Sequence, residues 1–402
     1  MADPSRVRIG GPLASFGQGF REELLRQGYR PNAAATQLQL MAHLSRWLGA
    51  KGLDAQALIP PTTTAFLADR RAAGYRLWLS PKALAPLLAY LRALGAASAP
   101  PAPELDPVED LLQRYRDYLV HERAVSVPVA HTYACLVRPF VAGRARSNDV
   151  ALADLTPHDV SSFILASCSG RTRGSAKMRV TAVRSLLSFL FIQGLIPAPL
   201  APSVPSVAGW RLAGLPRALE PDEVARLLAV CDRCSHTGRR DFAMLTLLVR
   251  LGLRAGEVRA LHLDDFHWRT GEVVIHGKGN RVEQMPMPPD VGEAVVDYLQ
   301  HSRPASAAGR LAFVRIRAPH RGFTTSAVSF AVRRAGQRAG LGPVTAHVLR
   351  HTAATQMLRA GAGLREVGQV LRHQRLQTTA IYAKVDRDRL RLIARVWPGG
   401  AG

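Results

Sequence analysis

The sequence predicts a mainly α-helical protein with one small β-sheet in its C-terminal half. Three observations lead to this prediction. Apolar residues recur at spacings of three and four, as in Leu40, Leu44, Trp47 and Leu48, which is the pattern of amphipathic helices. Stretches rich in proline and alanine interrupt the helical patterns at 95–107 and 197–216. A β-hairpin pattern occurs within 272–286.

The charge balance points to a polyanionic partner. The 402 residues carry 53 Lys+Arg against 30 Asp+Glu, a formal net charge of +23 that is spread along the chain. No single basic amphipathic helix dominates, which disfavours a membrane-surface role. A basic protein without a nucleic-acid role is the alternative at this point. Hydrophobic residues at 47% and charged residues at 21% are typical of a globular protein.

Other compositional features bound the location. The sequence has no run of 18 apolar residues and no basic-then-apolar start with a cleavage site, so we expect neither secretion nor a membrane span. Four cysteines in this length exclude a disulfide scaffold and fit a reducing cytoplasm. We therefore expect a cytoplasmic, nucleoid-associated protein.

The two proline-rich stretches read as linkers, because they can neither form helix nor bury much surface. They predict three domains, at 1–95, 104–197 and 217–397. The first two resemble each other: residues 58–74 match 155–170, and 87–95 match 186–194. We expect two small all-helical domains of similar design, with the first a duplicate of the second. Chance self-alignment of helical sequence rich in alanine and leucine is the alternative.

The third segment is predicted to be mixed. We expect helices over 221–229 and 242–253, then strands over 272–276 and 283–286 that flank a turn at 277–279. Further helical patterns follow at 325–339, 345–360, 364–372, 378–384 and 387–397.

Residues able to act on a phosphodiester stand at notable places in this segment. Arg254 follows an apolar helix, Glu257 comes three residues later, and Lys278 lies at the tip of the hairpin. His347 and Arg350 are three apart and so share one helix face. His373 is followed nine residues later by Tyr382.

This series resembles the tyrosine recombinase (phage integrase) family, whose signature is Arg, Lys, His-x-x-Arg, His and Tyr in that order. The resemblance is strong over 217–397 and looser over 104–200, which is similar to the family's helical, SAM-like core-binding domain that binds DNA. Residues 1–95 are not covered by the minimal pattern. The resemblance implies an α+β catalytic domain preceded by helical DNA-binding domains.

The residue types also suit the chemistry. Tyr382 would attack the phosphodiester and form a 3′-phosphotyrosyl link. Arg254 and Arg350 would clamp the non-bridging oxygens, where planar guanidinium donors match the developing charge. Lys278 would give its proton to the leaving 5′-oxygen, and His347 would assist the tyrosine's proton. The two remaining groups support this set, since His373 would add a hydrogen bond and Glu257 would orient the donors from behind. With these groups, we expect neither a metal nor ATP nor another cofactor to be required.

Two departures from the family pattern are visible. Arg372 stands where the family usually has glycine, which removes a natural helix terminator. Val348 stands where an acidic residue is common. Neither position carries a reacting group, so we expect effects on local geometry only.

Some residues of the right type receive another interpretation. His351 reads as a supporting or core histidine, and Tyr115, Tyr118, Tyr133 and Tyr298 read as packing residues. Cys231, Cys234 and His236 have metal-like spacing, but no second Cys/His pair follows at finger-like spacing, so no zinc site is predicted.

A cluster of basic residues in the second domain is the candidate DNA-binding element. It opens a helical pattern with no acidic residue among its members and would suit contacts to the DNA backbone, the alternative being a solvated face. Its members are Arg171, Arg173, Lys177, Arg179 and Arg184.

Together these features predict a site-specific DNA recombinase or integrase, expected to serve a mobile element. The family resemblance implies a homotetramer on two duplex DNA sites, or a hetero-assembly with related recombinases. An apolar stripe in the tail (Leu390, Ile393, Ala394, Trp397) would dock on a neighbouring protomer or on its own domain. A type IB topoisomerase-like enzyme and a catalytically silent DNA-binding regulator are the alternatives.

Overall fold

The computed structural model describes residues 3–98, 106–146, 149–208, 217–277 and 281–372. The chain divides into two compact units, one made of Met1–Ala99 and Gly214–Gly402 and the other of Pro100–Ala213. The apolar side chains of 13–97, 108–204 and 219–349 form separate clusters. The boundaries of three domains remain a prediction.

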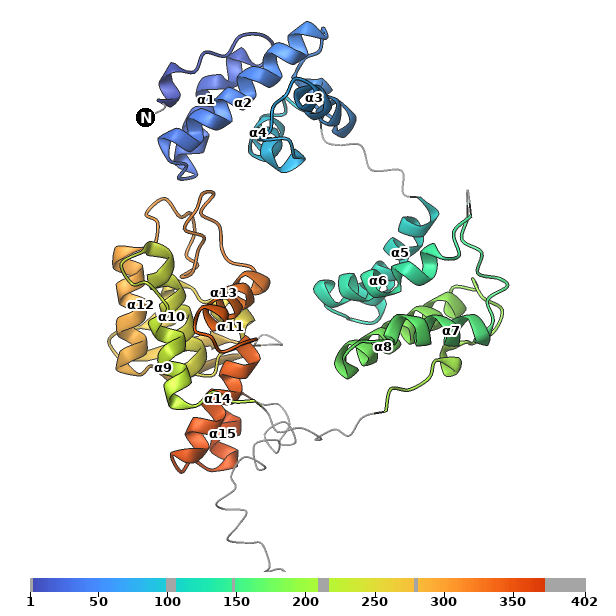
Figure 1. The fold of residues 1–402 in the computed structure, drawn as a ribbon, viewed down its shortest axis with the longest axis vertical. Coiled ribbons are helices and arrows are strands. Elements are labelled where there is room, and N and C mark those ends of the chain that lie inside the picture. Colours follow the sequence, from blue (N-terminus) through green and yellow to red (C-terminus); the bar gives the residue numbers. More distant parts are fainter. Residues whose placement is uncertain (1–2, 99–105, 147–148, 209–216, 278–280, 373–402) are drawn as a thin grey trace, which may run out of the picture. The chain divides into compact units, whose positions relative to one another are not determined.

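The N-terminal segment is helical, as Figure 1 shows in blue. Its main helices are α1 (Gly17–Arg26), α2 (Pro31–Ala50), α3 (Pro60–Ala72) and α4 (Pro81–Ala93). Proline in the first turn starts α2, α3 and α4, where its missing N–H costs no helical hydrogen bond. Phe20, Leu44 and Leu84 are fully buried in the centre of this cluster.

The second segment, like the first, has four main helices in its described part. They are α5 (Pro107–Asp117), α6 (Val127–Ala142), α7 (Pro157–Cys168) and α8 (Arg173–Ile192), with a π-helical turn at Tyr118–Glu122. Leu58 and Leu155, matched in the sequence comparison, are both buried, each shortly before a helix that begins with proline. These similarities agree with a duplication, which stays a prediction.

Tyr115 and Tyr118 pack in the core of the second segment, as expected. The Tyr115 hydroxyl donates to the Ala182 carbonyl oxygen at 3.2 Å, and both rings lie against Phe189. Burial raises the pKa of Tyr115, so this hydroxyl stays protonated.

The third segment surrounds α10 (His236–Arg250), which packs against α12 (Pro289–His301) and α14 (Ala346–Arg359). The other α-helices in the described part of this segment are α9 (Pro221–Ala229), α11 (Ala255–Ala260), α13 (Thr325–Arg338) and α15 (Leu364–Val370). No helix within the described ranges is long and apolar enough to cross a membrane.

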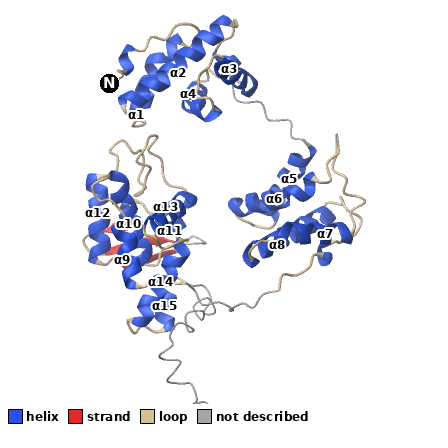
Figure 2. Ribbon diagram, viewed as in Figure 1, coloured by secondary structure: helices blue, strands red, loops and turns tan. Residues whose placement is uncertain are grey.

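The sheet is small and antiparallel, in the order β1 (Phe266–His267), β2 (Glu272–His276) and β3 (Val282–Pro286). Val273 pairs with Met285 across the β2–β3 hairpin, and Figure 2 shows the strands among the helices of this segment. The mainly α fold with a small sheet and the predicted hairpin are confirmed. The helical patterns at 378–384 and 387–397 lie outside the described residues.

Candidate active site

Arg254 and Glu257 form the first half of the site. Arg254 is the N-cap residue of the short helix α11, and Glu257 lies in its first turn. One Glu257 oxygen accepts the Arg254 backbone N–H at 2.8 Å, and the other accepts Arg254 Nη1 at 2.6 Å. The Glu257 side chain is only 4% exposed, whereas that of Arg254 is 43% exposed. The buried carboxylate therefore holds the guanidinium at the surface, where a phosphate can reach it.

Arg350 forms the second half, on α14. Arg350 is only 4% exposed, and its Nη1 donates to the Gly252 carbonyl oxygen at 2.7 Å. A second donor, Nη2, bonds the Leu371 carbonyl oxygen at the end of α15. These contacts join the loop that precedes Arg254 to α14 and α15.

Gly252 permits this close approach. It has φ +60°, and a Cβ added there would lie 2.6 Å from Leu371 Cδ2 and 3.3 Å from Ala353 Cβ. A larger residue would therefore meet both strain and a clash at the point where the two arginine-bearing elements join.

His347 lies in the first turn of α14, after the cap residue Thr345, whose hydroxyl accepts the Val348 backbone N–H at 3.2 Å. Its Nε2 is 2.8 Å from Nε2 of His351. Burial lowers the pKa of His347, and the nearby charges of Arg350 and Arg254 lower it further. A histidine held neutral in this way can accept a proton at pH 7.

His351 is buried, in agreement with its interpretation as a supporting residue. Burial, followed by the proximity of His347 and Arg350, lowers its pKa to about 4. Val348, one of the two departures from the family pattern, is partly buried against the apolar cluster of this segment.

Arg372 is a site residue that the sequence did not reveal. It follows α15 in the left-handed conformation, with φ +55°, and its N–H donates to the Gln369 carbonyl oxygen at 2.8 Å. The expectation that losing glycine removes the helix terminator is wrong, because the arginine itself adopts the terminating conformation. Its side chain turns inward, and Nη2 lies 2.9 Å from Glu257 Oε2.

Three predicted residues, Lys278, His373 and Tyr382, lie outside the described residues. The strands that flank the Lys278 turn are described, and the Gly277 N–H donates to the Arg281 carbonyl oxygen at 2.7 Å. Arg372 Nη1 also reaches Met285 Sδ on β3 at 3.1 Å. The hairpin that carries Lys278 therefore packs beside the residue that precedes His373.

The predicted DNA-binding cluster divides in two. Arg171, Arg173 and Lys177 are exposed at the start of α8, whose first turn has no acidic residue. Arg184 is exposed, and its Nη2 bonds the Val204 carbonyl oxygen at 2.9 Å. Arg179, in contrast, is only 9% exposed and donates to the Leu136 carbonyl oxygen at 3.4 Å. Its position favours a packing role and does not fit a contact with DNA.

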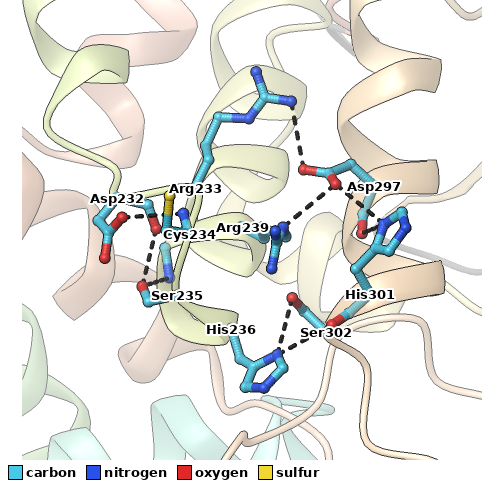
Figure 3. A network of polar contacts seen from close by, with 10 residues as sticks. Asp232, Arg233, Cys234, Ser235, His236, Arg239, Asp297, His301 and Ser302 are labelled. Atoms are coloured by element: carbon cyan, nitrogen blue, oxygen red, sulfur yellow. Dashed lines mark hydrogen bonds and ion pairs between the residues drawn. The ribbon is translucent and has the colours of Figure 1, made fainter.

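Cys234 and His236 lie in a polar junction between helices, whereas Cys231 is buried in the apolar cluster of this segment. Figure 3 shows Asp297 of α12 facing Arg233, Arg239 and His301, while His236 Nδ1 lies 3.1 Å from the His301 carbonyl oxygen. Burial raises the pKa of Cys231 to about 11, which disfavours the thiolate that a metal would need. These contacts tie α10 to α12.

Comparison with known proteins gives consistent results. Residues 217–389 match the model of the phage integrase family. The chain is 40% identical over 401 residues to y4rA of Sinorhizobium fredii (strain NBRC 101917 / NGR234), named as a candidate integrase/recombinase, with 97% of this chain and 96% of that protein covered. It is 28% identical over 293 residues to tyrosine recombinase XerD of Listeria monocytogenes serotype 4b (strain F2365), covering 71% of this chain and 97% of XerD.

Solved structures show the same fold. The XerH site-specific recombinase bound to its difH substrate matches with a TM-score of 0.56 and 21% identity, over 75% of this chain and 99% of that one. A lambda integrase dimer bound to a COC′ core site matches with a TM-score of 0.53 and 17% identity, over 73% and 98% of the two chains.

Proposed function

Since the chain belongs to the phage integrase family and is a site-specific recombinase of the tyrosine class, we propose that Tyr382 is its nucleophile. The tyrosine hydroxyl attacks a DNA phosphodiester, the 5′-oxygen of the next nucleotide leaves, and a 3′-phosphotyrosyl link holds the cut strand. Attack by a 5′-hydroxyl from the partner strand then reverses this step, so the bond energy is kept and no ATP is consumed.

One observation carries the assignment of the phosphate site. Arg350 and the loop that precedes Arg254 are joined through the Gly252 carbonyl oxygen, and His347 lies close enough for both arginines to lower its pKa. Two guanidinium groups beside a neutral imidazole suit the attack step. The guanidinium groups stabilise the charge of the phosphorane, and the imidazole accepts the tyrosine proton. Lys278 and His373 complete the set as proton donor and hydrogen-bond donor.

The test is the replacement of Tyr382 by phenylalanine. On a nicked substrate from which the cut end diffuses away, wild type should accumulate a denaturant-resistant protein–DNA adduct, and Tyr382→Phe should bind the same DNA without forming any. Tyr133→Phe is the matched control, because Tyr133 packs against the core of the second segment and should keep the adduct. An adduct that persists in Tyr382→Phe would place the nucleophile elsewhere. Strand cleavage by the wild type should survive treatment with EDTA, and cleavage that EDTA abolishes would indicate a metal nuclease.

Duplex DNA is the proposed partner, bound in part by Arg171, Arg173 and Lys177. Two features support this role: the exposed cations lie at the N-terminal end of a 20-residue helix, and backbone N–H groups at such an end attract phosphate. The related XerH and lambda integrase structures contain DNA. We place the protein in the cytoplasm, at the DNA of a mobile element, and inverted repeats flanking its gene would support that context.

The proposed assembly is a homotetramer on two sites, or a mixed tetramer with a related recombinase. The amphipathic stripe of Leu390, Ile393 and Trp397 supports docking between protomers, because it begins eight residues after Tyr382 and would link assembly to tyrosine placement. Truncation after Arg387 should leave single-site binding intact and abolish the paired complex. A truncated protein that still pairs two sites would mean that the tail docks on its own domain.

A further inference from the structure

The starting observation is that Glu257 has two arginine partners. Its Oε1 accepts Arg254 Nη1 at 2.6 Å, and its Oε2 accepts Arg372 Nη2 at 2.9 Å. The side chains of Arg372 and Glu257 are only 5% and 4% exposed, so solvent screens the attraction between these two charges weakly. The two partners differ in that Arg254 is 43% exposed and able to meet DNA, whereas Arg372 is enclosed.

The charge balance of this triad gives Arg372 a purpose. A carboxylate paired with Arg254 alone would cancel the positive charge that a scissile phosphate needs. With Arg372 on its other oxygen, the same carboxylate belongs to a group whose net charge is +1. Burial tends to raise the pKa of Glu257, but the charge of Arg372, followed by the bonds from Arg254, brings that pKa below its usual value. The carboxylate thus stays ionised and keeps orienting Arg254.

The backbone conformation of Arg372 also indicates a role for its side chain. The position has φ +55°, a conformation that glycine adopts without strain and arginine does not. An arginine that served only to end α15 would be a poor choice for this position. Its side chain instead spans three elements, reaching Glu257 on α11, Met285 on β3 and the Val370 carbonyl oxygen of α15.

We propose that Arg372 is a positioning residue of the recombination site, which acts through Glu257 to keep Arg254 oriented and positively charged toward the DNA phosphate. This inference rests on the proposed role of Arg254 in holding that phosphate. Arg372 directly precedes His373 in the sequence, and its contacts hold the last described residue before that histidine.

The experiment measures the rate of adduct formation and the DNA affinity of Arg372→Gly and Arg372→Lys. Glycine relieves the backbone and removes the charge, whereas lysine keeps both the charge and the strain. We expect Arg372→Gly to slow adduct formation about 10- to 100-fold while the Kd for DNA changes less than about threefold, and Arg372→Lys to restore part of the rate. Arg365→Gln, which removes an exposed charge from α15, the helix just before Arg372, is the control and should match wild type.

A double-mutant cycle tests the route of the effect. In a Glu257→Gln background there is no carboxylate charge to balance, so the Arg372→Gly defect should fall to less than about threefold. If Arg372→Gly does not fold, the cycle is run with Arg372→Lys. The inference is overturned if Arg372→Gly cleaves at the wild-type rate, if lysine is no better than glycine, or if the defect is equal in both backgrounds.

These outcomes are separate from the test of the nucleophile. An adduct that persists in Tyr382→Phe contradicts the proposed function whatever Arg372 does. A wild-type rate in Arg372→Gly, combined with loss of the adduct in Tyr382→Phe, contradicts only the role of Arg372.

Discussion

The Nε2 atoms of His347 and His351 lie 2.8 Å apart, so one ring can donate its Nε2–H and the other can accept it. If both rings were charged, two cations would face each other in a largely buried setting. Each ring therefore disfavours the protonation of the other, in addition to the cost of burial and the nearby arginines.

The first prediction concerns stability against pH. The folded-state pKa of His351 is about 4, below the ordinary value of 6.5, so the unfolded chain takes up a proton first as the pH falls. The stability that neutral His351 contributes should be fully present above pH 6.5 and lost between about pH 6.5 and 4. Across that window His351→Gln should lose on the order of 2 kcal/mol less than wild type in denaturant titrations. Parallel losses in the two proteins would contradict this assignment.

The second prediction separates the basic residues of α8. Arg173→Ala and Lys177→Ala should each weaken binding to all duplexes and reduce the slope of log K against log salt by about 0.9, the value for one lost phosphate contact. Arg179→Ala is the matched control, because its side chain is buried against α6. It should lower the stability of the second segment and leave the slope unchanged. A slope reduced equally by Arg179→Ala would return that residue to the DNA surface.

The third prediction concerns Lys278 as general acid. Lys278→Ala should form adducts slowly on ordinary DNA, because the leaving 5′-oxygen then lacks its proton donor. A substrate with sulfur in place of that bridging oxygen needs no such proton and should recover most of the rate. Single-turnover assays on the two substrates provide the comparison, and equal defects would assign Lys278 to binding.

The fourth prediction tests the junction at Gly252. Gly252→Ala should cost about 2 to 4 kcal/mol, because it adds backbone strain at φ +60° to a clash with Leu371. Gly271→Ala is the matched control, since Gly271 has φ +67° and no atom within 4 Å of an added Cβ. It should cost only about 1 kcal/mol. Denaturant titration measures both, and equal costs would mean that the close approach at Gly252 is unimportant.

Local signals allowed much of this fold to be predicted from the sequence. The helix at Pro221–Ala229 has the predicted bounds, because Pro221 starts it and apolar residues follow at helical spacing. The two strands of the hairpin were recognisable from the glycines of the turn between them. His347 and Arg350 were placed on one helix because their spacing is local.

Other elements had weak or misleading local signals. Helix α12 was not predicted from the sequence. It begins at Pro289, shortly after two other prolines, and a group of prolines is more typical of a loop than of the start of a helix. Helix α11 is only six residues long, too short for periodicity to show. Arg372 was missed because its partner Glu257 is 115 residues away, and no spacing rule reports an ion pair of that kind.

The separate apolar clusters have a consequence for calorimetry. Buried side chains of 13–97, 108–204 and 219–349 are cohesive within each cluster, so heat need not disrupt all of them at one temperature. A heat-capacity trace of the whole chain should resolve more than one peak, each with its own enthalpy. Substitutions near Arg254 and Arg350 should shift the melting peak of the cluster that contains Leu253 and Leu349. The peak of the cluster that contains Tyr115 and Phe189 should keep its temperature.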